Sequence, residues 1–167
     1  MKFKKATTED IQTIRTLADV IFHATYEELI SEAQMDYMFE WMYSPASLEE
    51  QLNTGHVFHI AYIDEEPCGF FSVELEDESK NLYHLQKLYL LPKFHGNGSK
   101  LLRGVFDYVK SVSPQKASIH LNVNRDNNRA IRFYEKSGLI KLRSVDVEIA
   151  PNFYMNDYIM GIDLERL

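Results

Sequence analysis

The sequence predicts an α/β fold of the α+β kind, in which helices pack against one mixed sheet. Three apolar runs between residues 56 and 91 have the length and composition of consecutive strands. Helical spacing of apolar residues precedes these runs. A strand, a helix and another strand follow one another between residues 81 and 124, as in a right-handed β-α-β unit. We therefore expect the element order β-α-α-β-β-β-α-β-α-β-β.

The N-terminal third is predicted to be mostly helical after a short strand at residues 3–7. Thr7 or Thr8 is expected to cap the first helix, because two acidic residues follow. The apolar residues with helical spacing there are Ile11, Ile14, Leu17, Ala18, Ile21 and Phe22. Residues 31–43 form a second expected helix. Ser47, with a glutamate three residues later, predicts the capping box of one more short helix.

The rest of the chain is predicted to combine strands with two further helices. The expected strands cover residues 56–63, 68–76, 81–91, 117–124, 145–150 and 157–164. The expected helices cover residues 101–109 and 127–137. Gly138 is expected at the C′ position of the second helix, in the left-handed conformation.

Composition limits the classes of protein that the chain can belong to. Its 167 residues fit a single domain, residues 1–167, whose core needs no disulfide or metal. The net charge of −7 argues against non-specific nucleic-acid binding, which requires clustered lysine and arginine. The single cysteine, Cys68, forms no internal disulfide, and no Cys/His spacing indicates a metal site. We expect no secretion signal, no membrane span and a cytoplasmic location, because no long apolar segment occurs.

Two glycines, Gly96 and Gly98, stand between an expected strand and an expected helix. A helix N-terminus carries unpaired N–H groups, and glycine lets a ligand approach the backbone, so this loop could hold a phosphate. The loop is not a dinucleotide fingerprint, because Leu101 stands where the third glycine would be, and no Walker A lysine follows. A turn without any ligand is the alternative.

A second motif follows about 30 residues later, where Asn127, Ala130 and Tyr134 lie on one side of an expected helix. The stretches "LYLLPKFHGNGSKLL" and "NVNRDNNRAIRFYEKSGL" together resemble the GNAT superfamily of acetyl-CoA-dependent N-acetyltransferases. The resemblance covers essentially the whole chain. It implies a GNAT-like acyl-CoA N-acyltransferase fold, acetyl-CoA as co-substrate, and acetyl transfer to a primary amine. A weaker similarity to bacterial polyamine acetyltransferases serves only to rank substrates.

The resemblance also implies roles for individual residues. The pantetheine arm and the acetyl carbonyl would bind the backbone of Leu88, Tyr89 and Leu90. The pyrophosphate would lie on Gly96, Asn97, Gly98, Ser99 and Lys100. Asn127 would contact the cofactor, and Tyr134 would be the general acid that protonates the departing CoA thiolate.

The glycine loop departs from the pattern of the superfamily. Counting forward from Pro92 places His95 at the usual basic position, with Lys100 where the second glycine should be. Counting back from the leucine pair makes Gly96 and Gly98 the glycine pair, with Lys93 at the basic position. The two counts differ by two residues, which indicates a shortened loop. The sequence therefore does not decide which backbone amides would bind the pyrophosphate.

His84 is the candidate base for the amine. It lies four residues before the first expected pantetheine contact, where several members carry Glu or His. A histidine with a pKa of about 6.5 can accept a proton near neutral pH. Other members use a Glu five residues before the asparagine, but Asn122 stands there and cannot act as a base. The sequence thus leaves His84, a water chain or a structural histidine as alternatives.

The remaining polar and aromatic residues are interpreted mainly as structural. Cys68 is expected to be buried in a strand, and His120 to be structural, while His56 and His59 show no recognisable spacing. Most aromatic and methionine side chains of the first two helices are expected in the core, although this region often walls the acceptor pocket of the superfamily. The acidic side chains there favour a solvated face over an amine site; they are Glu27, Glu28 and Glu32.

Three functions remain under comparison. The leading one is an N-acetyltransferase acting on a small-molecule amine, a polyamine or a peptide amine, with a homodimer left open. The second is an acyl-CoA-binding sensor or partner protein without transferase activity. The third, a nucleotide-binding module of another fold, is disfavoured because the fingerprints fail.

Overall fold

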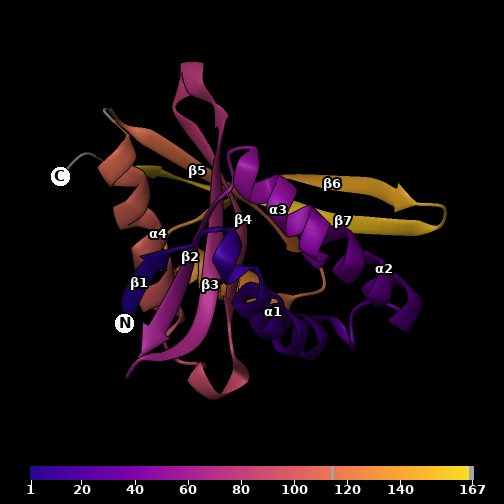
Figure 1. Cartoon of the computed structure of the whole chain (residues 1–167). Helices are drawn as coiled ribbons and strands as arrows, with labels where there is room; N and C mark the ends of the chain where they lie inside the picture. Colours follow the sequence, from indigo (N-terminus) through magenta and orange to yellow (C-terminus); the bar gives the residue numbers. More distant parts are fainter. Residues whose placement is uncertain (114, 166–167) are drawn as a thin grey trace.

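The structure is a computed structural model that describes residues 1–113 and 115–165. Seven strands form one sheet in the order β1-β2-β3-β4-β5-β7-β6 (Figure 1). The strands are β1 (Lys2–Lys5), β2 (Val57–Ile63), β3 (Glu66–Asp77), β4 (Leu82–Leu90), β5 (Ala117–Asn124), β6 (Ile140–Ala150) and β7 (Phe153–Leu164). The α-helices are α1 (Ile11–Tyr26), α2 (Glu32–Tyr43), α3 (Pro45–Asn53), α4 (Gly98–Val112) and α5 (Asn128–Lys136). The predicted α/β fold with a mixed sheet is confirmed.

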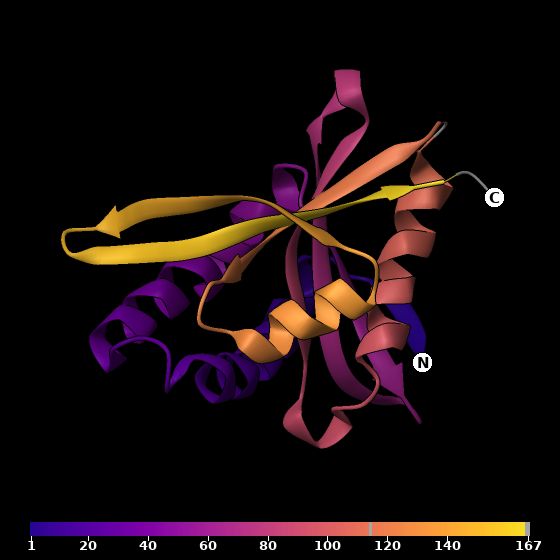
Figure 2. The same cartoon turned by 180° about the vertical axis from the view of Figure 1, so that it is seen from behind.

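Helices cover both faces of the sheet. Figures 1 and 2 show α1, α2 and α3 on one face and α4 and α5 on the other. Each face has its own apolar core: Phe22, Tyr43 and Phe58 belong to the first, and Leu101 and Ile131 to the second. Burying apolar side chains on both sides of the sheet stabilises this three-layer arrangement.

The sheet contains a single parallel pairing among the described residues, between β4 and β5. It extends only over residues 82–85 of β4 and 118–121 of β5. Beyond this point the strands diverge, as Figure 2 shows. The residues of β4 from Gln86 onward therefore have no strand partner on the β5 side, and their backbone groups on that edge are free for a ligand.

Two predicted helix ends are confirmed in detail. The Thr7 hydroxyl accepts a hydrogen bond from the Glu9 amide, and the Asp10 carboxylate accepts one from the Thr7 amide. Thr7 is therefore the N-cap of the short 3-10 helix Thr8–Asp10, which leads directly into α1. At the end of α5, Gly138 has φ of +96°. The amide of Gly138 donates to the Glu135 carbonyl and that of Leu139 to the Tyr134 carbonyl, which is a Schellman motif.

The start of the third helix was predicted wrongly. The N-cap is Ser44, whose hydroxyl accepts a hydrogen bond from the Ser47 amide at 3.2 Å, and α3 begins at Pro45. Proline suits the first position of a helix because it has no N–H to satisfy and its φ is already helical. Pro45 therefore opens α3, and three α-helices rather than two separate β1 from β2.

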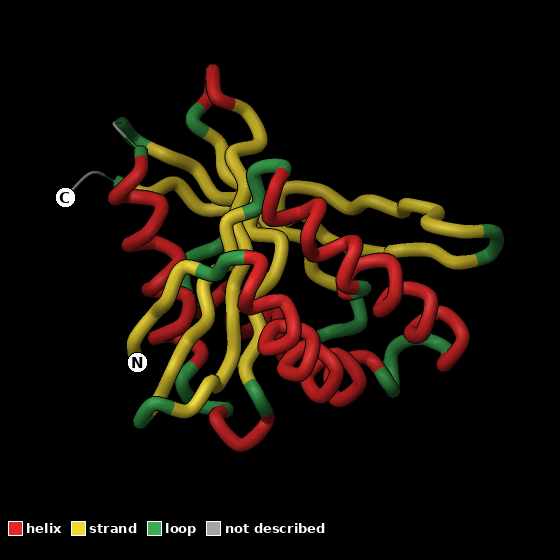
Figure 3. Tube along the Cα trace, viewed as in Figure 1, coloured by secondary structure: helices red, strands yellow, loops and turns green. Residues whose placement is uncertain are grey.

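The two C-terminal strands are longer than predicted. β6 begins at Ile140, and most of its residues are exposed, so its sequence lacks the alternation that indicates a half-buried strand. The β6–β7 hairpin projects beside α2 (Figures 1 and 3). It is tied there by hydrogen bonds from Gln34 Nε2 to the Tyr154 carbonyl and from the Tyr37 hydroxyl to the Ile149 carbonyl. None of the helices in the described part of the chain is long and apolar enough to cross a bilayer.

Candidate active site

A β-bulge in β4 sets which side chains face each side of the sheet. Ser72 of β3 pairs with Lys87, while Val73 pairs with Leu85, so Gln86 has no direct partner on β3. The extra residue reverses the alternation of the strand. Tyr89 consequently packs with the core under α1, and Leu88 with the core under α4 and α5.

A cavity of about 620 Å³ opens where β4 and β5 separate. We call it the larger cavity; β4, β5, the start of α4, α5 and α1 line it. It brings together most of the residues predicted to hold the cofactor, together with the predicted acid: Leu88, Tyr89, Leu90, His95, Gly96, Gly98, Ser99, Asn127 and Tyr134. Asn97, Lys100 and His84 are not part of its lining.

The glycine loop ends in a helix start that can bind an anion. Gly96 has φ of +102°, a backbone conformation that favours glycine, and α4 begins at Gly98. The amide and the side chain of Asn97 both donate to the Phe94 carbonyl. No described group accepts from the amides of Gly98 and Ser99, which lie at the positive end of the α4 dipole. These two amides are the best placed to bind a pyrophosphate.

Arg129 is a basic residue of this site that the sequence interpretation missed. Its Nη2 donates to His95 Nδ1 at 2.9 Å, across 34 residues of sequence, and both side chains line the larger cavity. Burial and the nearby guanidinium lower the pKa of His95, so Arg129 carries the positive charge here. Its position two residues after Asn127, within the second motif, could have indicated that it lies near the cofactor.

Tyr134 projects from α5 into the larger cavity. It is 9% exposed, and burial raises the pKa of its phenol above the ordinary value. Its hydroxyl donates to no group of the described residues, so its proton is free for a ligand atom. Asn127 is the N-cap of the same helix, with its Oδ1 accepting from the Ala130 amide at 3.2 Å. The two predicted residues of this motif thus border one cavity.

A second cavity of about 350 Å³, the smaller cavity, lies on the α2–α3 side of β4. It is lined by α1, α2, α3, β4, β5 and β7, and includes His84. Residues common to both cavities are Tyr26, Gln86, Tyr89 and Asn122. The hydroxyls of Tyr26 and Tyr89 lie 3.3 Å apart. The two cavities therefore meet beside the point where β4 and β5 separate.

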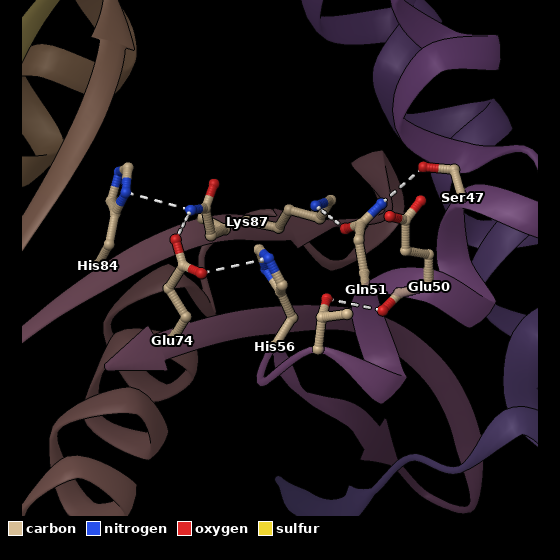
Figure 4. Close-up of polar contacts among 9 residues, drawn as sticks. Ser47, Glu50, Gln51, His56, Glu74, His84 and Lys87 are labelled. Carbon is tan, nitrogen blue, oxygen red and sulfur yellow. Dashed lines mark hydrogen bonds and ion pairs between the residues drawn. The ribbon is translucent and has the colours of Figure 1, made fainter. Parts of the chain in front are cut away.

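A chain of polar contacts determines the protonation of His84 (Figure 4). The Gln86 amide nitrogen donates to Glu74 Oε1 and also contacts His84 Nδ1 at 3.2 Å. Because a carboxylate only accepts, the amide nitrogen must face Glu74, and its second N–H then points at Nδ1. His84 Nδ1 is therefore an acceptor, and the ring proton lies on Nε2. Burial lowers the pKa of His84, which also favours this neutral form.

Asp157 of β7 supplies a carboxylate that the sequence interpretation did not single out. It is 4% exposed, lines the smaller cavity, and accepts a hydrogen bond from Asn122 Nδ2 at 3.3 Å. Burial raises the pKa of the Asp157 carboxyl. Asn122 occupies the β5 position where other superfamily members carry Glu, and here it holds a carboxylate from the neighbouring strand.

Lys87 is the second charged residue of the smaller cavity and was also missed. It is 6% exposed, and its Nζ donates to Gln51 Oε1 at 2.7 Å. Figure 4 shows its side chain running from β4 toward α3. Burial lowers the pKa of Lys87 to about 8.

The burial expected for Cys68 and the exposure expected for three glutamates are confirmed, whereas the sequence assigned no role to His59. Cys68 is fully buried, and its Sγ donates to the Ala61 carbonyl. His59 stacks on Phe71, and burial lowers its pKa to about 4. The acidic residues Glu27, Glu28 and Glu32 are exposed. The first two helices both fill the core and wall the smaller cavity; their residues in its lining include Tyr26, Met38, Trp41 and Met42.

The fold of this chain is similar to that of solved N-acetyltransferases. Residues 21–139, most of the chain, match the acetyltransferase (GNAT) family, and the chain belongs to this family. The resemblance indicated by the two sequence motifs is thereby confirmed.

The individual relatives and solved structures share only a limited part of their sequence with this chain. An uncharacterized N-acetyltransferase of Mycobacterium tuberculosis is 35% identical over 80 residues, which are 48% of this chain and 51% of that protein. The chain thus spans about half the length of the curated relatives it matches. The PaiA N-acetyltransferase from Thermoplasma acidophilum, solved with coenzyme A, has a TM-score of 0.76 and 24% identity over 99% of this chain and 98% of that one. The spermidine N-acetyltransferase from Vibrio cholerae, solved with CoA and spermine, has a TM-score of 0.70 and 19% identity over 97% and 94%.

Proposed function

We propose that the chain transfers the acetyl group of acetyl-CoA to a small primary amine. The observation that carries this proposal is the meeting of two cavities where β4 and β5 separate. One cavity has the groups that a diphosphate needs, and the other is a pocket of mixed apolar and polar lining that is large enough for a small amine. The PaiA and spermidine N-acetyltransferases of the same fold were solved with CoA, which supports the choice of cofactor.

The larger cavity fits acetyl-CoA, which would supply an activated thioester. The unpaired amides of Gly98 and Ser99 would bind the pyrophosphate, with the charge of Arg129 beside them. Gly96 and the helix dipole of α4 would support this binding, and Asn127 would add a side-chain amide. The free β4 edge would bind the pantetheine arm through the backbone of Leu88, Tyr89 and Leu90. Lys100 is exposed and would act through its charge, while Asn97 shapes the loop.

The proton transfers are assigned to side chains at the junction of the cavities. Tyr134 gives its free phenolic proton to the departing thiolate, since its raised pKa keeps the hydroxyl protonated at neutral pH. Asp157, held by Asn122, takes the proton from the amine. We assign this role to Asp157 rather than to the candidate base His84, because Gln86 Nε2 lies 3.2 Å from His84 Nδ1 and would donate a hydrogen bond to it. In this proposal His84 is a hydrogen-bond donor beside Asn122 at the edge of the smaller cavity.

The test of the proposed function has two parts. Acetyl-CoA at about a hundred times its Kd should stabilise the folded chain by about 2.7 kcal/mol, measured by thermal unfolding. Thiol release with a panel of primary amines then tests transfer. No stabilisation refutes the cofactor assignment. Stabilisation without thiol release for any amine favours the alternative, an acyl-CoA-binding protein without transferase activity.

The base assignment is tested by the pH dependence of kcat/KM for an accepted amine. Asp157→Asn should lower the rate most below the pKa of the amine, with recovery at high pH. His84→Gln keeps a hydrogen-bond donor and should retain the wild-type profile. The opposite pattern would return the base role to His84. A cytoplasmic location and a homodimer stay predictions, to be checked by cell fractionation and light scattering.

A further inference from the structure

Lys87 is a buried cation without a carboxylate partner among the described residues. Its hydrogen bond goes to a neutral amide oxygen, that of Gln51, and the rings of Tyr43 and Phe58 lie 5.6 and 5.3 Å from Nζ. An ammonium has three N–H donors, so two remain. Burying a charge with only neutral partners is unfavourable, and an anion beside it would relieve this cost.

Nearby groups of the chain do not supply that anion. Glu74 is the acidic residue that acts on Lys87, but its two oxygens are engaged elsewhere. Oε1 accepts from Gln86, and Oε2 lies 3.2 Å from His56 Nε2 (Figure 4). Gln51 is held as well, because its Nε2 donates to the Met42 carbonyl and to the Ser47 hydroxyl. The surroundings of Lys87 are thus fixed, and its remaining donors are left for a ligand in the smaller cavity.

The smaller cavity contains one positive and one negative side chain, which form no ion pair with each other. Apart from two histidines, the charged residues of its lining are Lys87 on β4 and Asp157 on β7. A polyamine would place a second ammonium in a cavity with one carboxylate and a fixed cation. An amino-acid-like ligand, with one ammonium and one carboxylate, matches both charges.

We propose that the smaller cavity binds a small amine that also carries a carboxylate, with the carboxylate on Lys87 and the amine beside Asp157. This names the substrate class of the proposed function and rests on it. The two charges then select for an amino-acid-like acceptor, and the chain's overall charge of −7 does not set this selectivity.

Matched pairs of amines that differ only by a carboxylate test the proposal. Suitable pairs are alanine and ethylamine, ornithine and putrescine, and lysine and cadaverine. For at least one pair, kcat/KM of the carboxylated member should be higher by about tenfold to a hundredfold, the range of a hydrogen bond to a charged group. Lys87→Met should remove this preference, and Lys87→Arg should retain part of it. Lys136→Met, an exposed lysine on α5 outside both cavities, is the matched control and should keep the wild-type ratio.

Binding to the CoA-loaded protein, measured by calorimetry, gives a readout that does not depend on turnover. The carboxylated member of a pair should bind more tightly to the wild type, and Lys87→Met should remove the difference. Equal binding of both members, or tighter binding of the diamine, overturns the carboxylate site. Thiol release with putrescine alone would also overturn it while leaving the proposed transferase function intact. Preferential binding without thiol release would support the carboxylate site and refute the transferase function.

Discussion

The pH dependence of folding stability offers a direct measurement of the environment of Lys87. Its pKa falls from 10.5 to about 8 because the charged form is desolvated. The groups that surround it come from α2, α3, β2 and β3: the rings of Tyr43 and Phe58, the amide of Gln51, and the carboxylate of Glu74. The negative charge of Glu74 raises the pKa of Lys87, but burial lowers this pKa by more.

The sign of the effect follows from proton linkage. Between pH 8 and 10.5 the unfolded chain keeps the lysine proton and the folded chain has lost it, so the free energy of unfolding rises with pH. Below pH 8 the destabilisation is fully present. One pKa unit corresponds to about 1.4 kcal/mol, so the cost at pH 7 is about 3 kcal/mol. About 2 to 3 kcal/mol of it should disappear between pH 7 and pH 10.

Urea unfolding of the wild type and of Lys87→Met at several pH values isolates this contribution. Other titrating groups are common to both proteins, so the difference between their free energies of unfolding should shrink by about 2 to 3 kcal/mol from pH 7 to pH 10. Gln51→Glu is a matched variant, because a carboxylate in place of the amide oxygen that lies 2.7 Å from Nζ should keep Lys87 charged and reduce the effect. A difference that stays constant with pH would refute the reasoning.

Three further predictions concern the proposed reaction. Tyr134→Phe should lower kcat by about a hundredfold to ten-thousandfold with CoA affinity nearly unchanged, because it removes the acidic hydroxyl and keeps the ring; a wild-type rate would exclude Tyr134 as the acid. Gly98→Val should weaken CoA binding, measured by calorimetry, far more than Asn97→Ala. The reason is that a Cβ at Gly98 would lie 3.1 Å from the Phe133 ring. Equal effects of the two changes would mean that the loop does not position the cofactor. Asp157→Asn, which keeps the shape of the side chain, should lower kcat/KM at pH 7 by about a hundredfold, and an unchanged rate would leave a water chain as the base.

The sequence alone determined the family and, apart from the third helix before β2, the order of the elements. Its signals are local: apolar periodicity over a few turns or strands, the Thr7 cap, Gly138 at a helix end, and glycines before a helix. Such patterns reflect backbone geometry within a short window, so they can be interpreted without knowledge of distant contacts. The exposed strand β6 was partly missed because residues that pack on neither face carry no periodic constraint.

The chemistry of the acceptor side was decided only by the tertiary structure. The bulge at Gln86 turns Lys87 toward α3, whereas strict alternation would place it on the face of Leu85. Asp157 reaches Asn122 across 35 residues of sequence, and only the pairing of β5 with β7 brings them together. Contacts between strands depend on register, and a shift of one residue moves each side chain to the other face. Bulges and long-range pairings leave no periodic trace in the sequence, so the charges that would recognise the acceptor become visible only in the folded chain.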